Sequence, residues 1–180
     1  METPAQRARS QSIAFGLIAF GVLARLFPHP WNVTPVTALA LFGGATLSLR
    51  WAIGLPLATI VLSDLVLGLH DVIAFTWSGV ILTGLLGLWI RPQPTVRRIA
   101  IASGLASTLF FLLTNFGVWL VGDNGTMYPK TLQGLWQCYA AALPFYRNAL
   151  LGDLVYSAAI FGVYAVATSG RLARQAARSS

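Results

Sequence analysis

Long apolar stretches dominate this 180-residue chain, and they constrain its fold more than any other feature. A helix needs about 20 mostly apolar residues to cross the hydrocarbon core of a membrane. Stretches of roughly that length recur along the chain, separated by connectors that contain Pro, Gly, Asn and Asp. The predicted spans cover residues 11–27, 34–49, 51–69, 72–90, 99–121 and 149–168. The sequence therefore predicts an all-α membrane protein with six transmembrane helices. The second span is short and contains Gly43 and Gly44, so a broken helix is the alternative there.

The rest of the chain forms two tails and one long connector. We expect a cytoplasmic N-terminal tail over 1–10, a single membrane domain over 11–168, and a basic cytoplasmic tail over 169–180. Residues 122–148 are too polar at their start for a span. Apolar residues recur at helical spacing from Tyr128 to Tyr146, which predicts an amphipathic helix at the interface or a capping segment over the bundle. Pro144 is expected to end this helix.

The composition argues against several other classes of protein. Only 9% of residues are charged, against about 25% in a typical soluble domain. The net charge of +7 forms no basic stripe with interleaved aromatic residues, which argues against nucleic-acid binding. The single cysteine, Cys138, excludes an intramolecular disulfide and a multi-cysteine metal site. No phosphate-binding loop, GxSxG elbow or HExxH motif is present in the sequence.

The basic residues predict the orientation, because Lys and Arg concentrate in short cytoplasmic loops. An even number of spans with both termini inside places most of the 12 Lys and Arg in the cytoplasm. On that side lie Arg7, Arg9, Arg50, Arg91, Arg97, Arg98, Arg171, Arg174 and Arg178, whereas Arg25, Lys130 and Arg147 lie outside. A cleaved signal peptide is the alternative for the first span. We expect none, because the apolar run continues through Phe27.

Three polar residues inside the predicted spans are the first candidates for a binding site: Asp64, Asn115 and Asp153. Such groups are costly in a membrane and commonly functional. With a helical rise of roughly 1.5 Å per residue, all three fall roughly 6–9 Å inside the outer boundary, so we predict one polar layer. The cytoplasmic half is apolar apart from small or hydroxyl residues such as Ser103 and Ser107. The sequence therefore predicts a cavity that opens outward and is closed below.

A purely structural role is the alternative for the same residues. Asp64 would then pair with Arg25 or Arg147, and Asp153 would cap the last helix near Asn148. The outer connectors supply further candidate contacts, although aromatic residues at this depth more often form an interface belt. These candidates are His29, Trp31, Asn32, His70, Tyr128, Lys130, Trp136, Tyr139, Arg147 and Asn148.

Five blocks of the chain resemble a family of small bacterial membrane proteins whose function is uncharacterised. The blocks are His29–Ala45, Leu62–His70, Thr114–Leu120, Met127–Leu132 and Phe145–Asp153. In size, span number and outward cavity, the chain also resembles the substrate-binding (S) components of energy-coupling-factor vitamin transporters, including the predicted vitamin B12 uptake membrane protein. That second resemblance is architectural, and no residue is carried over from it.

The resemblance implies a substrate-binding or uptake protein of the bacterial inner membrane for a vitamin or similar micronutrient. Cobalamin is the first candidate ligand, with no cofactor intrinsic to the chain. If cobalamin binds, Cys138, His29 or His70 would be the cobalt ligand. An ATPase coupling module is the expected partner beside the lipid bilayer, because the chain has no nucleotide motif. The alternatives are a membrane enzyme at the outer face and a structural or assembly subunit.

Overall fold

The computed structural model describes residues 3–28, 30 and 32–179 of the chain. The described part is all α-helical, without β-strands, and contains six helices. They are α1 (Pro4–Leu26), α2 (Val36–Thr46), α3 (Leu49–Leu67), α4 (Ile73–Ile90), α5 (Val96–Gly125) and α6 (Leu132–Ser179). The prediction of an all-α chain is confirmed, and four of the six predicted transmembrane helices, α3 to α6, are long and apolar enough to be membrane spans.

Local sequence signals explain where several helices begin and end. Thr3 and Gln6 form a capping box in front of α1, in which each side chain accepts a hydrogen bond from the other residue's backbone N–H. The Thr95 hydroxyl accepts from the Arg98 N–H at the start of α5. Asp123 and Asn124 have φ angles of 49° and 53°, so regular α5 helix stops near the predicted end at residue 121.

Two predicted helices differ from the structure. The second span is an 11-residue helix, about 16 Å long at the helical rise, and it is therefore too short to cross a membrane alone. The predicted segment over 122–148 does not form a separate helix. α6 runs without interruption from Leu132 through Pro144, so the prediction that Pro144 ends a helix is wrong.

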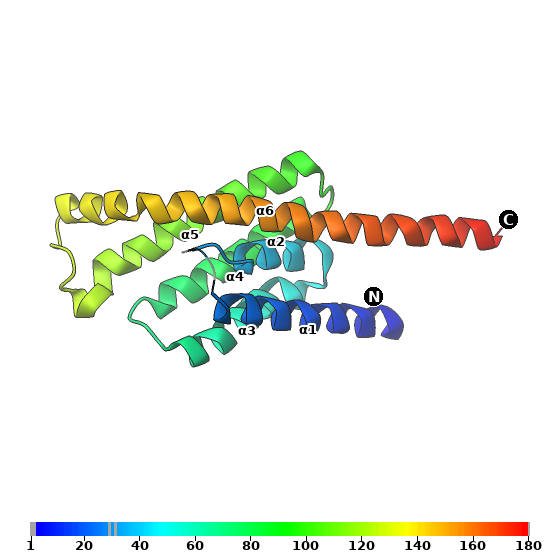
Figure 1. Cartoon of the computed structure of the whole chain (residues 1–180), viewed down its shortest axis with the longest axis horizontal. Helices are drawn as coiled ribbons and strands as arrows, with labels where there is room; N and C mark the ends of the chain where they lie inside the picture. The colour runs from blue at the N-terminus through cyan, green and yellow to red at the C-terminus, as the bar shows by residue number, and fades with distance from the viewer. Residues whose placement is uncertain (1–2, 29, 31, 180) are drawn as a thin grey trace.

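Contacts with α5 hold the first turns of α6 in helical form despite Pro144. The Tyr139 hydroxyl donates to the Leu112 carbonyl at 2.7 Å, and the Cys138 thiol donates to the Asn115 carbonyl at 3.3 Å. A proline in a helix removes one backbone hydrogen bond, and these contacts anchor the turns of α6 that precede Pro144 to α5. The expected capping segment is thus the outer end of an α5–α6 hairpin, on the left in Figure 1.

Successive helices alternate in direction. Phe15 of α1 contacts Trp51 of α3, and further along both helices Arg25 contacts Asp64, so α1 and α3 run parallel. The helix α2, which connects them in the chain, runs in the opposite direction. In the α5–α6 hairpin, Asn115 and Leu112 lie opposite residues 138 and 139, and Ser107 lies opposite Asp153. α1 therefore begins and α6 ends at the same end of the bundle (Figure 1).

The short helix α2 is the centre of the bundle and contacts all five other helices. Ten of its eleven residues are buried. Close approach to α4 depends on glycine, because a Cβ on Gly44 would overlap Gly84 and Gly87. Arg91 binds the C-terminal end of α2, donating to the Gly44 carbonyl at 2.9 and 2.7 Å and to the Leu47 carbonyl at 2.6 Å.

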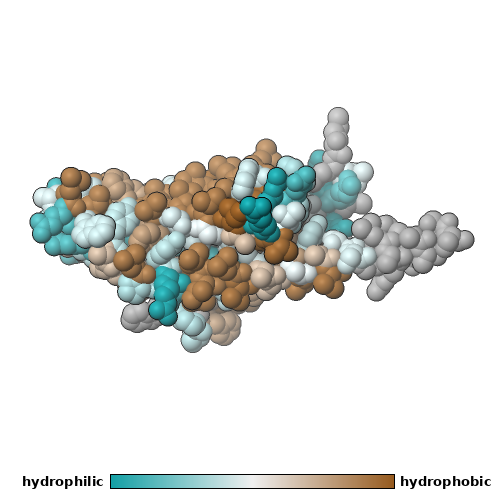
Figure 2. All heavy atoms as spheres, turned by 90° about the horizontal axis from the view of Figure 1, so that it is seen from above, coloured by the Kyte–Doolittle hydropathy of each residue, from teal (hydrophilic) through white to brown (hydrophobic). Residues whose placement is uncertain are grey.

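The outer surface of the bundle is strongly apolar. Figure 2 shows hydrophobic residues over most of its middle, with hydrophilic groups at the hairpin end. Large side chains such as Val163, Val166 and Leu65 are exposed by 72%, 75% and 65%. Four helices, α3 to α6, are long and apolar enough to cross a membrane by length and composition. This is the pattern of a multi-pass membrane protein in contact with lipid.

Candidate functional site

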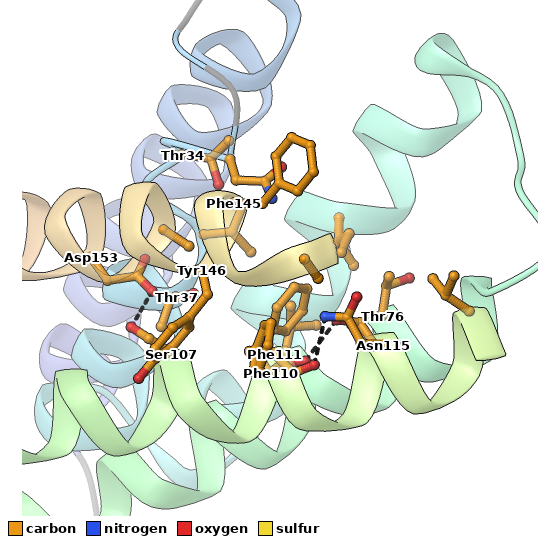
Figure 3. A pocket seen from close by; sticks show the side chains of 18 of the residues that line it. Thr34, Thr37, Thr76, Ser107, Phe110, Phe111, Asn115, Phe145, Tyr146 and Asp153 are labelled. Atoms are coloured by element: carbon orange, nitrogen blue, oxygen red, sulfur yellow. Dashed lines mark hydrogen bonds between the residues drawn. The ribbon is translucent and has the colours of Figure 1, made fainter. Parts of the chain in front are cut away.

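A cavity of about 340 Å³ lies in the half of the bundle that contains the C-terminal ends of α1, α3 and α5. All six helices and the segment before α2 contribute to it, as Figure 3 shows in part. The exposed surface of the lining is mostly apolar, although about half of the lining residues carry a hydroxyl, amide or charged group. It consists of Arg25, Asn32, Thr34, Val36, Thr37, Ile60, Thr76, Val80, Ser107, Phe110, Phe111, Thr114, Asn115, Val118, Ala142, Phe145, Tyr146, Ala149 and Asp153.

The two longest walls are single faces of α5 and α6. On α5 the lining residues are 107, 110, 111, 114, 115 and 118, and on α6 they are 142, 145, 146, 149 and 153. Both sets follow the three- and four-residue spacing that places side chains on one helix face. Tyr146 joins the two walls, since its hydroxyl lies 2.8 Å from the Thr108 hydroxyl. The walls therefore form from local helix periodicity and one interhelical hydrogen bond.

Asp153 lies at the deep end of the cavity and is only 5% exposed. The Ser107 hydroxyl donates to its carboxylate at 2.6 Å, and Thr37 of α2 is a second hydrogen-bonding partner. Figure 3 shows Asp153, Ser107 and Thr37 together, with Phe110 and Phe111 between them and Asn115. Three different helices thus converge on one carboxylate.

The region below Asp153 is closed. The Ser103 and Ser157 hydroxyls lie 3.3 Å apart, one turn further along α5 and α6. A buried cluster follows toward the end where the chain termini lie, and it includes Leu41, Phe42 and Phe161. No described residue of this cluster is ionisable. The cavity therefore has a polar floor and an apolar seal beneath it.

Arg25 enters the cavity wall from the last turn of α1 and is held in a fixed position. Its guanidinium forms a salt bridge to Asp64 at 2.9 Å and donates to the Ser63 hydroxyl at 2.7 Å. Trp77 of α4 donates to the other Asp64 oxygen at 2.9 Å. Asp64 is 1% exposed and does not line the cavity itself. Its role in this geometry is to neutralise and orient Arg25.

Asn115 lies near the opposite end of the cavity from Asp153. Its amide nitrogen donates to the Phe111 carbonyl at 2.8 Å, one turn earlier in α5. Asn115 and Ser107 are eight residues apart, so Asn115 and Asp153 differ in depth by about 12 Å along α5. The prediction that Asp153 and Asn115 share one layer is wrong, because Ala149 is not the outer end of the last helix.

Of the residues predicted from the sequence, the cavity brings together Asn32, Asn115 and Asp153. Asp64 acts through Arg25, which matches the pairing considered as a structural alternative. His29 and Trp31 lie outside the described residues. The other predicted contacts do not line this cavity: His70, Tyr128, Lys130, Trp136, Tyr139, Arg147 and Asn148.

Several of these outer residues have structural surroundings instead. Lys130 donates to the Trp119 carbonyl and lies 5.7 Å from the centre of the Trp119 ring. Trp136 is 73% exposed on α6, as expected for an interface aromatic residue. Cys138 is buried against α5 and does not line the cavity. Within the described part of the chain, no group of three or more His, Cys, Asp or Glu residues is placed to hold a metal ion.

The sequence reasoning missed the hydroxyl and aromatic residues of the cavity. The missed residues are Thr34, Thr37, Thr76, Ser107, Phe110, Phe111, Thr114, Phe145 and the cavity position of Tyr146. One signal was available, namely the helical spacing of Ser107, Phe111, Thr114 and Asn115 along one face of a predicted span. No comparable signal marks Thr34 or Thr37, because they precede or begin a uniformly apolar helix.

Comparison with known proteins gives one match. The family model described as a family of unknown function, DUF6580, matches residues 5–176. No curated protein and no solved structure matches the chain. The match covers all six helices, including every described residue of the cavity. The chain therefore belongs to the DUF6580 family.

Proposed function

We propose that this chain is a membrane-embedded binding protein that captures a small solute, such as a vitamin or similar micronutrient, for uptake. One observation carries the proposal: a cavity of about 340 Å³ with a largely apolar surface, in which Arg25, Asn32, Asn115 and Asp153 are the charged and amide groups. Ligand sites in proteins are typically mostly apolar, with a small number of convergent polar groups that set orientation.

The direction of capture follows from the position of the cavity. It lies at the ends of α1, α3 and α5, away from the end where the termini lie. With both termini in the cytoplasm, as the basic residues predict, this half faces the periplasm. The apolar cluster around Phe42 and Phe161 closes the cytoplasmic side. Release to the inside then needs a conformational change, supplied by a coupling module in the membrane or by trapping of the solute.

The size of the cavity limits the ligand. Sites for drug-sized ligands are roughly 300–1,000 Å³, and this cavity is at the lower end of that range. A corrinoid with its nucleotide tail is much larger. Cobalamin therefore becomes a weaker candidate than a compact micronutrient, and Cys138 is not positioned to ligate a group bound in the cavity.

Small molecules that copurify with the full-length protein test the proposal. The protein is extracted in mild detergent and exchanged into volatile buffer, and retained compounds are identified by mass spectrometry. Ala142 lines the cavity, whereas the neighbouring Ala141 is exposed and does not. Ala142→Phe fills the cavity and should abolish retention, and Ala141→Phe should leave retention unchanged. Equal retention by both variants, or none above an empty-detergent control, would contradict the proposal.

A further inference from the structure

The charges around the cavity do not balance. Arg25 and Asp64 are 2.9 Å apart and cancel each other, and theirs is the one salt bridge that the described residues form. Asp153 is buried to a similar degree, yet its described partners are the neutral hydroxyls of Ser107 and Thr37. A buried carboxylate without a cation carries an uncompensated desolvation cost. The cavity therefore has one buried carboxyl group without a cation, and a cationic occupant would favour its charged form.

The groups around Asp153 favour a carboxyl group that accepts hydrogen bonds. The Ser107 hydroxyl lies 2.6 Å from the Asp153 carboxyl group and 2.9 Å from the Ser103 carbonyl, and the shorter distance is typical of a hydrogen bond to a carboxylate. Thr37 is in the first turn of α2, whose positive dipole end has no side-chain cap. Both features favour the charged form of the carboxyl group, whereas burial favours its neutral form, so a cation in the cavity would shift the balance toward the carboxylate. Asp153 also lines the cavity, so an occupant is able to reach it.

The wall beside Asp153 is aromatic. Phe110, Phe111 and Tyr146 line the cavity, and the rings of Phe111 and Tyr146 are 4.7 Å apart at an interplanar angle of 37°. Figure 3 shows these rings next to the Asp153 end. The faces of aromatic rings attract cations, and this attraction is stronger when the site is dry. An anionic group combined with aromatic faces is the arrangement that recognises ammonium groups.

We propose that the occupant of this cavity is a small organic cation, whose ammonium or similar group pairs with Asp153 against Phe111 and Tyr146. The inference rests on the proposed function, since it specifies the chemical class of the captured solute. The positive charge of Arg25 is already neutralised by Asp64, so Arg25 does not require an anionic group on the ligand. The amide of Asn115, two turns of α5 away, is available to a polar group at the other end of the ligand.

Pairs of probes that differ only in charge test the class directly. Choline and 3,3-dimethylbutan-1-ol have the same shape, but one carries a quaternary nitrogen and the other a neutral carbon. Benzylamine and benzyl alcohol form a second pair. Binding to the purified full-length protein is measured by calorimetry and by thermal shift. We expect at least one cation to bind tenfold or more tightly than its neutral partner.

Variants then locate the effect. Asp153→Asn keeps the shape but removes the charge and replaces one acceptor oxygen by an N–H donor, and it should reduce the cation preference to less than twofold. Asp123→Asn removes an exposed carboxylate outside the cavity and should leave the preference unchanged. If Asp153→Asn does not fold, Phe111→Leu serves instead, because it retains the carboxylate and should reduce the preference several-fold. An unchanged preference in both cavity variants would overturn the proposal.

The two proposals fail in different ways. In one outcome, the wild-type protein prefers neither cation over its isostere, and the copurified compounds are neutral or anionic and are lost in Ala142→Phe. The organic-cation inference is then wrong, and the proposal of solute capture stands. If neither probe binds and nothing copurifies, both proposals are wrong. Cation binding that persists in Ala142→Phe would place the cation outside the cavity and would refute the inference.

Discussion

Removal of Asp64 should destabilise the bundle far more than removal of both members of its salt bridge. Asp64 is 1% exposed, and its two oxygens are satisfied by Arg25 and Trp77, each at 2.9 Å. Asp64→Leu leaves the Arg25 guanidinium without its counter-charge among apolar helices. Breaking a buried pair in this way costs about 3–5 kcal/mol.

The double variant Arg25→Met/Asp64→Leu should recover part of this loss. It removes both charges and fills the space with apolar side chains of similar length, a change that is often neutral or stabilising. One unsatisfied group remains, the Trp77 indole N–H, which costs about 1–3 kcal/mol, while the Ser63 hydroxyl still donates to the Thr59 carbonyl at 2.8 Å. We therefore expect the double variant to be more stable than Asp64→Leu alone by about 1–3 kcal/mol.

Reversible unfolding in mixed detergent, followed by tryptophan fluorescence, measures these free energies. A double-mutant cycle with Arg25→Met gives the coupling energy between the two residues. A coupling energy near zero, with the double variant as unstable as the sum of the single variants, would refute the reasoning. Asp71→Asn is the matched control, since Asp71 is an exposed carboxylate at the same end of the bundle.

Three further predictions concern the helix framework. A Cβ on Gly84 would overlap the α3 backbone, so Gly84→Ala should lower the free energy of unfolding by more than about 2 kcal/mol, whereas Gly104→Ala, with open space around it, should be neutral or slightly stabilising. Arg91→Ala removes all three hydrogen bonds to the end of α2 and should cost about 2–4 kcal/mol, with Arg91→Lys recovering only part because it lacks the planar donor fork. Pro144→Ala should stabilise α6 by about 1–3 kcal/mol, because it restores a backbone donor inside a continuous helix. Unfolding in detergent measures the change in the free energy of unfolding for each variant. A Pro144→Ala protein that is less stable than the wild type would contradict the prediction for α6.

The positions of most helices were predictable because hydropathy reports how long a stretch remains apolar. α3 and α4 begin and end within two residues of their predicted bounds. The turn after α5 was also evident, since Gly122, Asp123 and Asn124 favour a helix end. These features depend on neighbouring residues alone.

Features that depend on contacts between helices were not predictable in the same way. α2 is apolar on all sides, and hydropathy does not distinguish a helix surrounded by lipid from one surrounded by protein. Pro144 was expected to break a helix, because the contacts that anchor this part of α6 to α5 come from a distant part of the chain. For the same reason, the sequence indicated that Asp153 is important but did not reveal its partner Ser107.

The candidate site shows the same division. Asn115 and Asp153 were found because amide and carboxyl groups are rare in apolar spans. Arg25 was assigned to the outer loops, yet it lines the cavity because Asp64 holds it in the bundle. Hydroxyl and aromatic side chains are common in membrane helices, so their presence on one face becomes informative only when the opposite wall is known.

The burial of α2 has a consequence for how the protein enters the bilayer during synthesis. A translocon releases segments that are stable in lipid by themselves, and a helix of about 16 Å does not match a hydrocarbon core of about 30 Å. Nearly all of its surface is covered by helices that the ribosome makes later. We therefore expect α2 to be held stably in the bilayer only once α3 to α6 have packed around it.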